Sequence, residues 1–271
     1  MTGRNTLPYP VLDALPLGAH RLMMLTDEKL FCATGVRIAF TGRSGGVSEG
    51  PYESLNCAEW IGDDDRAVAR NLAIICEAIG ADASSLRLFT QVHETHLARI
   101  DEKSTPAPHG ETADGAVVSV PAVPAMLRAA DCLLLAIVSP TGRFALAHAG
   151  WRGAVAHIAR IAVASLAECD DANPSTYNAY IGPHICEDCF EVGIEVEERF
   201  RQEFGDDVIP RARRVSLAAA VAHDLRAAGL DARRIVAANA CTMCDPERYY
   251  SYRATNGSCG RHALVAYKQE E

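Results

Sequence analysis

The sequence predicts a fold of the α/β or α+β class, in which a mixed or antiparallel sheet arrangement is flanked by helices. Two apolar runs joined by a tight turn indicate a β-hairpin, and several amphipathic helical segments are interspersed with short strand-like segments. The 271 residues, 49% of them apolar, suffice for a full hydrophobic core. We therefore expect a single domain over residues 1–271.

Five short segments rich in β-forming residues are predicted to be strands. The first, "VRIAFTG" at 36–42, alternates as a strand does. The others are bounded by Gly, Pro or polar turns and cover residues 86–92, 115–120, 133–138 and 144–150. Only "PTGR" at 140–143 separates the last two, so we expect them to be antiparallel neighbours.

Four segments are predicted to be helices. Residues 63–80 begin with three aspartates, carry apolar residues from Val68 to Ile79 on one face and end at Gly80. Residues 151–168 place Val155, Ile158, Ala162 and Leu166 on one face of a single helix. Two further helical patterns lie near 193–204 and 216–229.

The charge and the N-terminal sequence limit the partners and the location of the protein. A net charge of −9 and the lack of a Lys/Arg-rich block argue against nucleic acid and favour a small substrate. Residues 1–20 contain prolines and charges where a signal peptide is apolar, and no run approaches the ~18 apolar residues of a membrane span. We expect a cytoplasmic monomer or homodimer, not bound to a membrane, whose ten cysteines are thiols or metal ligands.

Three residues at predicted strand ends form a candidate metal site. If 133–138 and 144–150 pair, Cys132 and His148 lie at the end of the hairpin opposite its turn. His93 ends another predicted strand, so three strand ends can converge on one ion. One thiolate and two imidazoles suit Zn²⁺ with a fourth position open for water. The alternative for Cys132 is a small buried core residue.

Two other metal patterns need separate interpretation. "HETH" at 93–96 is one residue shorter than the zincin H-E-x-x-H motif and lies in a strand-like context, so it does not predict a zincin helix. Two C-x-x-C pairs can make a tetrahedral structural site, but long intervening sequence leaves unrelated thiols or disulfides as alternatives. These cysteines are Cys186, Cys189, Cys241 and Cys244.

The order and spacing of nine motifs resemble the bacterial family once labelled laccase-domain or multicopper polyphenol oxidase proteins and now described as purine nucleoside phosphorylases. The motifs include "TGRSGG", "TQVH", "ADGAVVS", "ADC", "AHAGWRG" and "GRHAL", and the resemblance covers about residues 35–267. It implies a mixed α/β sandwich flanked by helices. Departures are Phe190, where Tyr is usual, and Ala254, where a second Arg often follows "SYR".

The resemblance also implies a zinc site and an activity. The ligands it implies are His93, Cys132 and His148. The implied reactions are phosphorolysis of adenosine, inosine, guanosine and S-methyl-5′-thioadenosine, and deamination of adenosine. The implied partners are therefore purine nucleosides and phosphate, and copper is a less favoured metal than zinc.

Phosphorolysis also needs a cationic group for phosphate and groups that orient or transfer protons. Arg43, in the glycine-flanked "TGRSGG", is the first candidate for phosphate, followed by Arg152 at a predicted helix start and by Arg253. Asp131 and Asp114 are candidates for acid–base catalysis or for orienting a histidine ligand. Each arginine has a structural ion pair as its alternative.

Three other functions compete with the zinc enzyme. A multicopper laccase needs about ten histidine ligands, mostly in H-x-H pairs, whereas this chain has nine histidines and no H-x-H. A metal-free hydrolase would use Cys132 as nucleophile and His148 or His93 as base. A non-enzymatic interaction role leaves these three residues unexplained.

Overall fold

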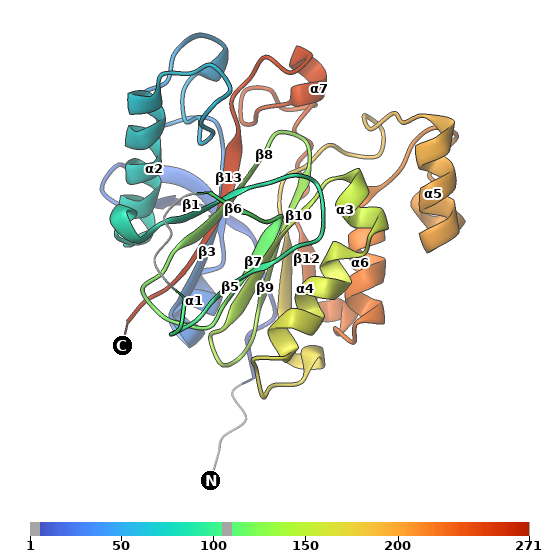
Figure 1. Cartoon of the computed structure of the whole chain (residues 1–271), viewed down its shortest axis with the longest axis horizontal. Helices are drawn as coiled ribbons and strands as arrows, with labels where there is room; N and C mark the ends of the chain where they lie inside the picture. Colours follow the sequence, from blue (N-terminus) through green and yellow to red (C-terminus); the bar gives the residue numbers. More distant parts are fainter. Residues whose placement is uncertain (1–5, 105–109, 271) are drawn as a thin grey trace.

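Two mixed β-sheets lie face to face between helices in the computed structural model, which describes residues 6–104 and 110–270 (Figure 1). Helix α2 covers the outer face of one sheet, and α3 to α6 lie on the outer side of the other (Figure 1). Apolar side chains from both sheets form a shared core between them. The predicted mixed sandwich flanked by helices is confirmed.

The seven-stranded sheet has the order β1-β2-β3-β13-β8-β4-β6. Its strands are Asp13–Leu17, Leu22–Thr26, Val36–Thr41, His262–Lys268, Ala125–Ala129, Arg87–Thr90 and Glu111–Thr112 in that order. The six-stranded sheet has the order β12-β11-β9-β10-β7-β5. Its strands are Ile235–Ala237, Asn178–Ile181, Leu133–Val138, Phe144–Ala149, Gly115–Val118 and Ala98–Ile100.

The α-helices lie mostly between the strands of the chain. They are α1 (Glu28–Thr34), α2 (Asp65–Ile79), α3 (Trp151–Val155), α4 (Ile158–Ala167), α5 (Ile194–Phe204), α6 (Leu217–Ala227) and α7 (Tyr252–Thr255). The search for a helix long and apolar enough to cross a membrane finds none within 6–104 and 110–270.

Helix α2 begins and ends where the sequence predicts. The Asp64 side chain accepts a hydrogen bond from the Arg66 N–H, which satisfies one of the free amides of the first turn. Gly80 follows the helix with φ of 79°, a conformation that glycine adopts without steric cost. The apolar face from Val68 to Ile79 packs on the seven-stranded sheet.

Strand β3 confirms the strand predicted over 36–42, and all six residues of Val36–Thr41 are buried. The reason is that β3 lies inside the sheet with neighbours on both faces: Ile38 and Phe40 contact the core between the sheets, and Ala39 contacts the α2 side.

The single helix predicted over 151–168 is wrong in one respect, because the structure divides it into α3 and α4. His157 has φ of 60°, which interrupts the helical hydrogen-bond ladder. Its Nδ1 lies 2.9 Å from a carboxylate oxygen of the buried Asp224 in α6, and its Nε2 lies 3.2 Å from Glu203. These contacts account for the break at a position where the apolar pattern continues.

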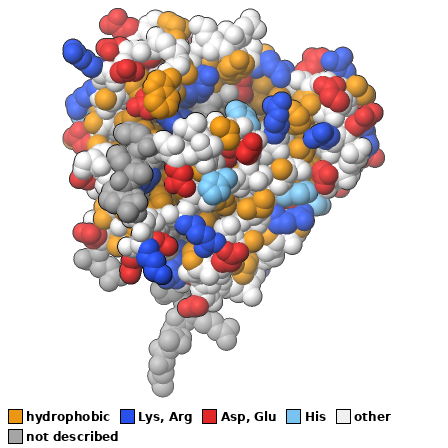
Figure 2. All heavy atoms as spheres, in the orientation of Figure 1, with side chains coloured by type: hydrophobic (Ala, Val, Ile, Leu, Met, Phe, Trp, Pro, Cys, Tyr) orange, Lys and Arg blue, Asp and Glu red, His pale blue; other side chains and the backbone are white. Residues whose placement is uncertain are grey.

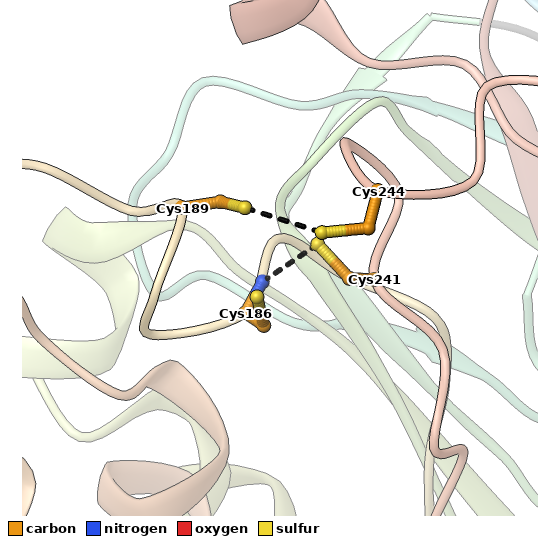
Figure 3. A group of neighbouring side chains, drawn as sticks. All are labelled: Cys186, Cys189, Cys241 and Cys244. Carbon is orange, nitrogen blue, oxygen red and sulfur yellow. Dashed lines mark hydrogen bonds between the residues drawn. The ribbon is translucent and has the colours of Figure 1, made fainter.

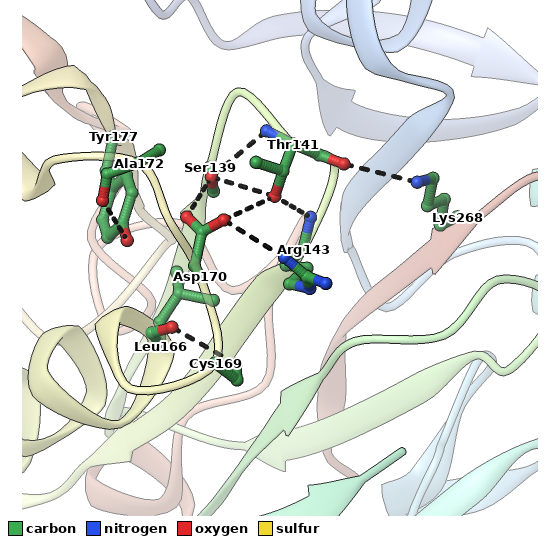
Figure 4. Close-up of polar contacts among 9 residues, drawn as sticks. All are labelled: Ser139, Thr141, Arg143, Leu166, Cys169, Asp170, Ala172, Tyr177 and Lys268. Carbon is green, nitrogen blue, oxygen red and sulfur yellow. Dashed lines mark hydrogen bonds and ion pairs between the residues drawn. The ribbon is translucent and has the colours of Figure 1, made fainter. Parts of the chain in front are cut away.

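Asp170 fixes the turn of the β9–β10 hairpin (Figure 4). Its carboxylate accepts hydrogen bonds from the Ser139 hydroxyl and, at 2.8 Å, from the Thr141 hydroxyl, and lies 3.5 Å from Arg143 Nη1. Lys268 Nζ donates to the Thr141 carbonyl at 3.4 Å. This end of the hairpin is therefore held by polar contacts of its own, away from Cys132 and His148.

Basic and acidic side chains are interspersed over the face shown in Figure 2. A continuous basic surface, which a nucleic acid would require, is not present on this face. The distribution agrees with the net charge of −9.

His262 in β13 predicts a measurable loss of stability in acid. The side chain is buried, and neither ring nitrogen has a hydrogen-bond partner among the described residues. Burial, with a smaller effect of Arg261, lowers the pKa of His262 to about 3. A histidine in the unfolded chain has a pKa of about 6.5. Below that pH the unfolded chain therefore binds a proton at this residue and the folded protein does not. Stability therefore falls as the pH falls from about 6.5 towards 3.

Replacing His262 by leucine should remove this acid sensitivity. Relative to the wild type, the variant should gain about 1–2 kcal/mol in free energy of unfolding between pH 7 and pH 5, measured by denaturant titration. His96→Leu, at an exposed histidine, is the control. An equal stability difference at both pH values would contradict the assignment.

Candidate functional site

The β9–β10 hairpin brings two predicted ligands together at the end opposite its turn. Cys132 immediately precedes β9, and His148 lies in β10 opposite Leu134. The Cys132 side chain is half-buried, and His148 is only 3% exposed. The pairing predicted from the "PTGR" turn is confirmed.

His93 joins this group from the other sheet. It follows β4 of the seven-stranded sheet, and its Nε2 lies 3.8 Å from Cys132 Sγ. The His93 and His148 ring centroids are 4.8 Å apart. One ligand atom from each of His93, Cys132 and His148 lies within 4.8 Å of the others. Bonds of 2.0–2.3 Å to one tetrahedral ion separate ligand atoms by about 3.3–3.8 Å, so the group suits a single metal ion.

The carboxylate of Asp114 holds both histidine segments in place. It is fully buried, and Oδ1 lies 2.9 Å from His148 Nδ1. The same carboxylate accepts the backbone N–H groups of Val92, His93 and Glu94 at 2.8–3.1 Å. Because Nδ1 of His148 is engaged in this way, Nε2 is the nitrogen free to bind a ligand. Burial opposes ionisation, but these hydrogen bonds outweigh it and lower the pKa of Asp114.

Gly150 leaves room for the ligand group. A Cβ at this position would lie 2.7 Å from His93 Cδ2 and 3.2 Å from Cys132 Sγ. Its φ of −66° is one that any residue adopts, so the need for glycine is steric. The fit of the three donors and the space beside them supports a metal site.

Cys132 and His148 influence the charge of one another. Burial acts against the charged form of each, but attraction between the Cys132 thiolate and the imidazolium of His148 outweighs it. The pKa of Cys132 is lowered and that of His148 is raised. The thiolate, which both metal binding and nucleophilic attack require, is therefore favoured.

Asp131 ties its loop to two distant segments. Its carboxylate accepts hydrogen bonds from the Thr242 hydroxyl at 2.6 Å and from the Arg253 N–H at 2.7 Å. Its carbonyl accepts the Ile185 N–H at 2.9 Å. Asp131 has φ of 88°, so it turns the chain just before Cys132 instead of continuing a strand. Of the two roles predicted for Asp131, acid–base catalysis or orientation of a ligand, its hydrogen bonds favour a positioning role.

The three candidate ligands line a cavity of about 560 Å³. This size lies within the range of about 300–1,000 Å³ typical of small-molecule sites. The wall also contains aromatic and cationic side chains, which are Trp60, Phe89, Trp151, Phe190, Tyr252, Arg128, Arg152, Arg253 and Arg261. Such a wall can contact a flat apolar group and an anion at once.

Arg43 was the first sequence candidate for phosphate, and the structure does not place it in the cavity lining. Its guanidinium donates to the carbonyls of Glu53 and Pro246 at 2.8–3.0 Å and lies over the Tyr250 ring. The glycine-flanked loop thus uses this arginine to hold distant backbone segments together. These contacts favour the structural alternative for Arg43, and its role toward phosphate stays a prediction.

Arg152 and Arg253 do line the cavity. Arg152 lies over the Trp151 ring and also borders a second cavity of about 420 Å³, which His93 and Arg199 share. Arg253 lies over the Phe190 ring and donates to the Glu191 carbonyl at 3.0 Å. The helix predicted to attract an anion at Arg152 is only the five-residue α3, so its dipole adds little and the side-chain charge carries the argument.

The four cysteines of the two C-x-x-C pairs also form one group. Their sulfur atoms lie within 4.8 Å of one another. The structure therefore brings the two pairs to one place, as a shared metal site requires. The ligand groups with His or Cys that the described residues contain are this cluster and the group of His93, Cys132 and His148.

Comparison with known proteins identifies the family. Residues 37–269 match the family model described as multi-copper polyphenol oxidoreductase laccase. The chain belongs to this laccase-like family.

Several members of the laccase-like family carry names of nucleoside enzymes. A purine nucleoside phosphorylase of Deinococcus radiodurans is 34% identical over 226 residues, which cover 82% of this chain and 85% of the relative. Adenosine deaminase RL5 of an unknown prokaryotic organism is 30% identical over 263 residues, covering 91% and 100%. The structure of YlmD from Geobacillus stearothermophilus aligns with a TM-score of 0.83 at 26% identity, covering 91% of this chain and 96% of that chain. The family resemblance of the sequence is confirmed.

Sequence reasoning missed several cavity residues of this laccase-like protein. Arg128 lies four positions before Cys132, and Arg261 lies within the "GRHAL" motif. Trp60 and Tyr252 are exposed aromatics, 78% and 55% accessible. Their exposure was not visible in the sequence, but an aromatic residue inside a polar stretch is a signal that could have indicated them.

Proposed function

We propose that this chain is a zinc-dependent purine nucleoside phosphorylase that acts on adenosine, inosine, guanosine and S-methyl-5′-thioadenosine and also deaminates adenosine. The observation that carries the proposal is the convergence of His93, Cys132 and His148 on one side of a substrate-sized cavity. The names of the relatives supply the class of substrate.

Zinc is the metal we propose for the group of His93, Cys132 and His148. Two imidazoles and one thiolate leave one position of a tetrahedron open, which is the composition of catalytic zinc sites. A His₂Cys set also occurs in blue copper sites, which add a weak axial ligand such as Met or Gln. The described lining contains no Met, and the Gln91 side chain is engaged with both backbone groups of Arg128. The multicopper interpretation is disfavoured further by the nine histidines.

The residues around the cavity divide the work of the reaction. A zinc ion held by the three ligands would supply Lewis-acid activation of a water molecule at neutral pH. Arg152 and Arg253 would hold phosphate near the ribose, and Phe190 and Tyr252 would contact the purine ring. Asp131 would keep Arg253 and Cys132 in position through the hydrogen bonds described above.

A product assay tests the reaction. Purified protein incubated with adenosine and phosphate should release adenine and ribose 1-phosphate, and adenosine without phosphate should yield inosine. A protein that produces neither set of products at any zinc loading would contradict the proposed function.

Replacing Arg152 and replacing Arg43, which have different surroundings, should change different properties of the protein. Arg152→Ala should raise the KM for phosphate about 10–100-fold, because a charge-assisted hydrogen bond to an anion contributes about 1.5–3 kcal/mol. Arg43→Ala should leave that KM unchanged and lower the thermal midpoint, because it removes three hydrogen bonds to carbonyls. The measurements are steady-state kinetics at varied phosphate and thermal unfolding. A phosphate effect at Arg43 and none at Arg152 would reverse the assignment.

A metal-free hydrolase with Cys132 as nucleophile is the second candidate. The observation that favours it is the lowered pKa of Cys132 beside two histidines. The two candidates make opposite predictions for zinc.

A further inference from the structure

The two C-x-x-C segments leave the same end of the six-stranded sheet. Strands β11 and β12 pair in parallel, and the pairing continues to a bridge between His184 and Cys241. Cys186 and Cys189 follow β11, whereas Cys241 and Cys244 follow β12. Because parallel strands end at the same edge, the topology brings together cysteines that are 55 residues apart in the chain.

Each segment forms a tight turn that presents its two sulfurs to the other (Figure 3). The Cys186 carbonyl accepts the Cys189 N–H at 3.0 Å, and the Cys241 carbonyl accepts the Asp245 N–H at 3.1 Å. The Cys186 N–H also donates to Cys241 Sγ at 3.3 Å. A backbone N–H aimed at sulfur stabilises a thiolate.

The sulfur positions fit a tetrahedral ion. Cys189 Sγ and Cys244 Sγ are 3.4 Å apart, and all four sulfurs lie within 4.8 Å of one another. Four Zn–S bonds of about 2.3 Å place sulfurs about 3.8 Å apart, whereas a disulfide needs about 2.05 Å. Every one of the four is a free cysteine, so the group is a set of thiols at metal-binding spacing.

The cluster lies behind one wall of the cavity. Ile185 and Phe190, which flank Cys186 and Cys189, line the cavity. Thr242, between Cys241 and Cys244, donates to the Asp131 carboxylate next to Cys132. An ion that joins the two cysteine segments would therefore fix the wall that carries Phe190 and the turn that precedes Cys132.

We propose that Cys186, Cys189, Cys241 and Cys244 bind a second, structural Zn²⁺ that joins the loops after β11 and β12 and stabilises this wall. Four thiolates fill the coordination shell, so the centre has no open position for a substrate. The proposal stands on the cysteine geometry and does not depend on the reaction.

Zinc counting tests the proposal. Protein reduced, stripped of metal, reloaded with excess Zn²⁺ and desalted should retain two zinc ions per chain by plasma mass spectrometry. The Cys189→Ser/Cys244→Ser variant should retain one and show a lower thermal midpoint. Cys132→Ser should also retain one, with the midpoint less affected, so failure at either centre is seen separately. The control is Cys32→Ser/Cys169→Ser, an exposed and a half-buried cysteine outside both groups, which should retain two.

Cobalt and thiol reactivity provide independent measurements. Co²⁺-loaded protein should show the strong thiolate-to-metal charge-transfer absorption of a tetrathiolate site, and the double variant should lose it. If that variant does not fold, the wild type still decides the question: chelation should make all four thiols reactive toward an alkylating reagent. Unchanged zinc content in the folded double variant, disulfides in the intact mass of reduced and reloaded protein, or four thiols that react equally with and without zinc would each overturn the proposal.

Discussion

Cys132→Ser should lose bound metal from the group of His93, Cys132 and His148 and lose activity at the same time. Serine retains a small hydroxyl but replaces a soft thiolate with a poor neutral zinc ligand. We expect activity to fall by at least about a hundredfold, since even loss of a group that only orients a ligand costs about 10–100-fold. Excess zinc kept in the solution should restore part of both the metal content and the activity, and desalting should remove both again. The measurements are zinc content and nucleoside turnover on the same preparation.

The same variant separates the zinc enzyme from the metal-free hydrolase. If Cys132 is the nucleophile, zinc content is irrelevant to activity and no metal restores the serine variant. Wild-type protein that stays fully active after verified zinc removal, and that alkylation of Cys132 then inactivates, would establish the covalent mechanism instead.

Asp114→Ala should damage both the fold and the ligand group. The variant leaves His148 Nδ1 and three backbone N–H groups without their buried acceptor. We expect a loss of roughly 3–5 kcal/mol in the free energy of unfolding and about 10–100-fold weaker zinc binding. Asp114→Asn keeps one acceptor oxygen, so its stability and zinc affinity should lie between those of the wild type and those of Asp114→Ala. Denaturant unfolding and competitive zinc titration measure these effects.

Asp170→Ala is the matched control at the other end of the same hairpin. It removes the acceptor of the Ser139 and Thr141 hydroxyls without touching either histidine. It should lower stability and leave zinc affinity unchanged. If Asp114→Ala lost stability but bound zinc as tightly as Asp170→Ala, the orienting role of Asp114 would be wrong.

Local patterns predicted the parts of the site that local structure builds. The tight turn at 140–143 sets the hairpin, so Cys132 and His148 were placed together correctly from sequence. Asp114 was predicted either as an acid or base or as a group that orients a histidine, and its contact with His148 Nδ1 agrees with the second alternative. The approach of His93 to the other two residues depends on how the two sheets pack. Its position at the end of a predicted strand indicated this approach, and the family motif indicated it more strongly.

The sequence was least informative where contacts join distant segments. Arg43 lies in a loop with the glycines of an anion-binding turn, but its guanidinium donates a hydrogen bond to the carbonyl of Pro246, 203 residues away. The four cysteines meet through the parallel pairing of β11 and β12, and β12 was not predicted from its three residues. His157 interrupts the helix because its side chain contacts the Asp224 carboxylate on α6. The sequence of residues 151–168 alone gives no sign of this contact.

The division of the ligands between two sheets has a mechanical consequence. His93 follows a strand of the seven-stranded sheet, whereas Cys132 and His148 belong to a hairpin of the six-stranded sheet. Sliding one sheet over the other would pull the Cys132 sulfur and the two imidazoles apart. An ion bound to all three would therefore cross-link the two sheets. By thermodynamic linkage, whatever loosens the interlayer core must weaken ion binding by the same free energy with which the ion resists that loosening. If the group of His93, Cys132 and His148 binds an ion, its metal affinity would therefore report on packing far from the ion itself.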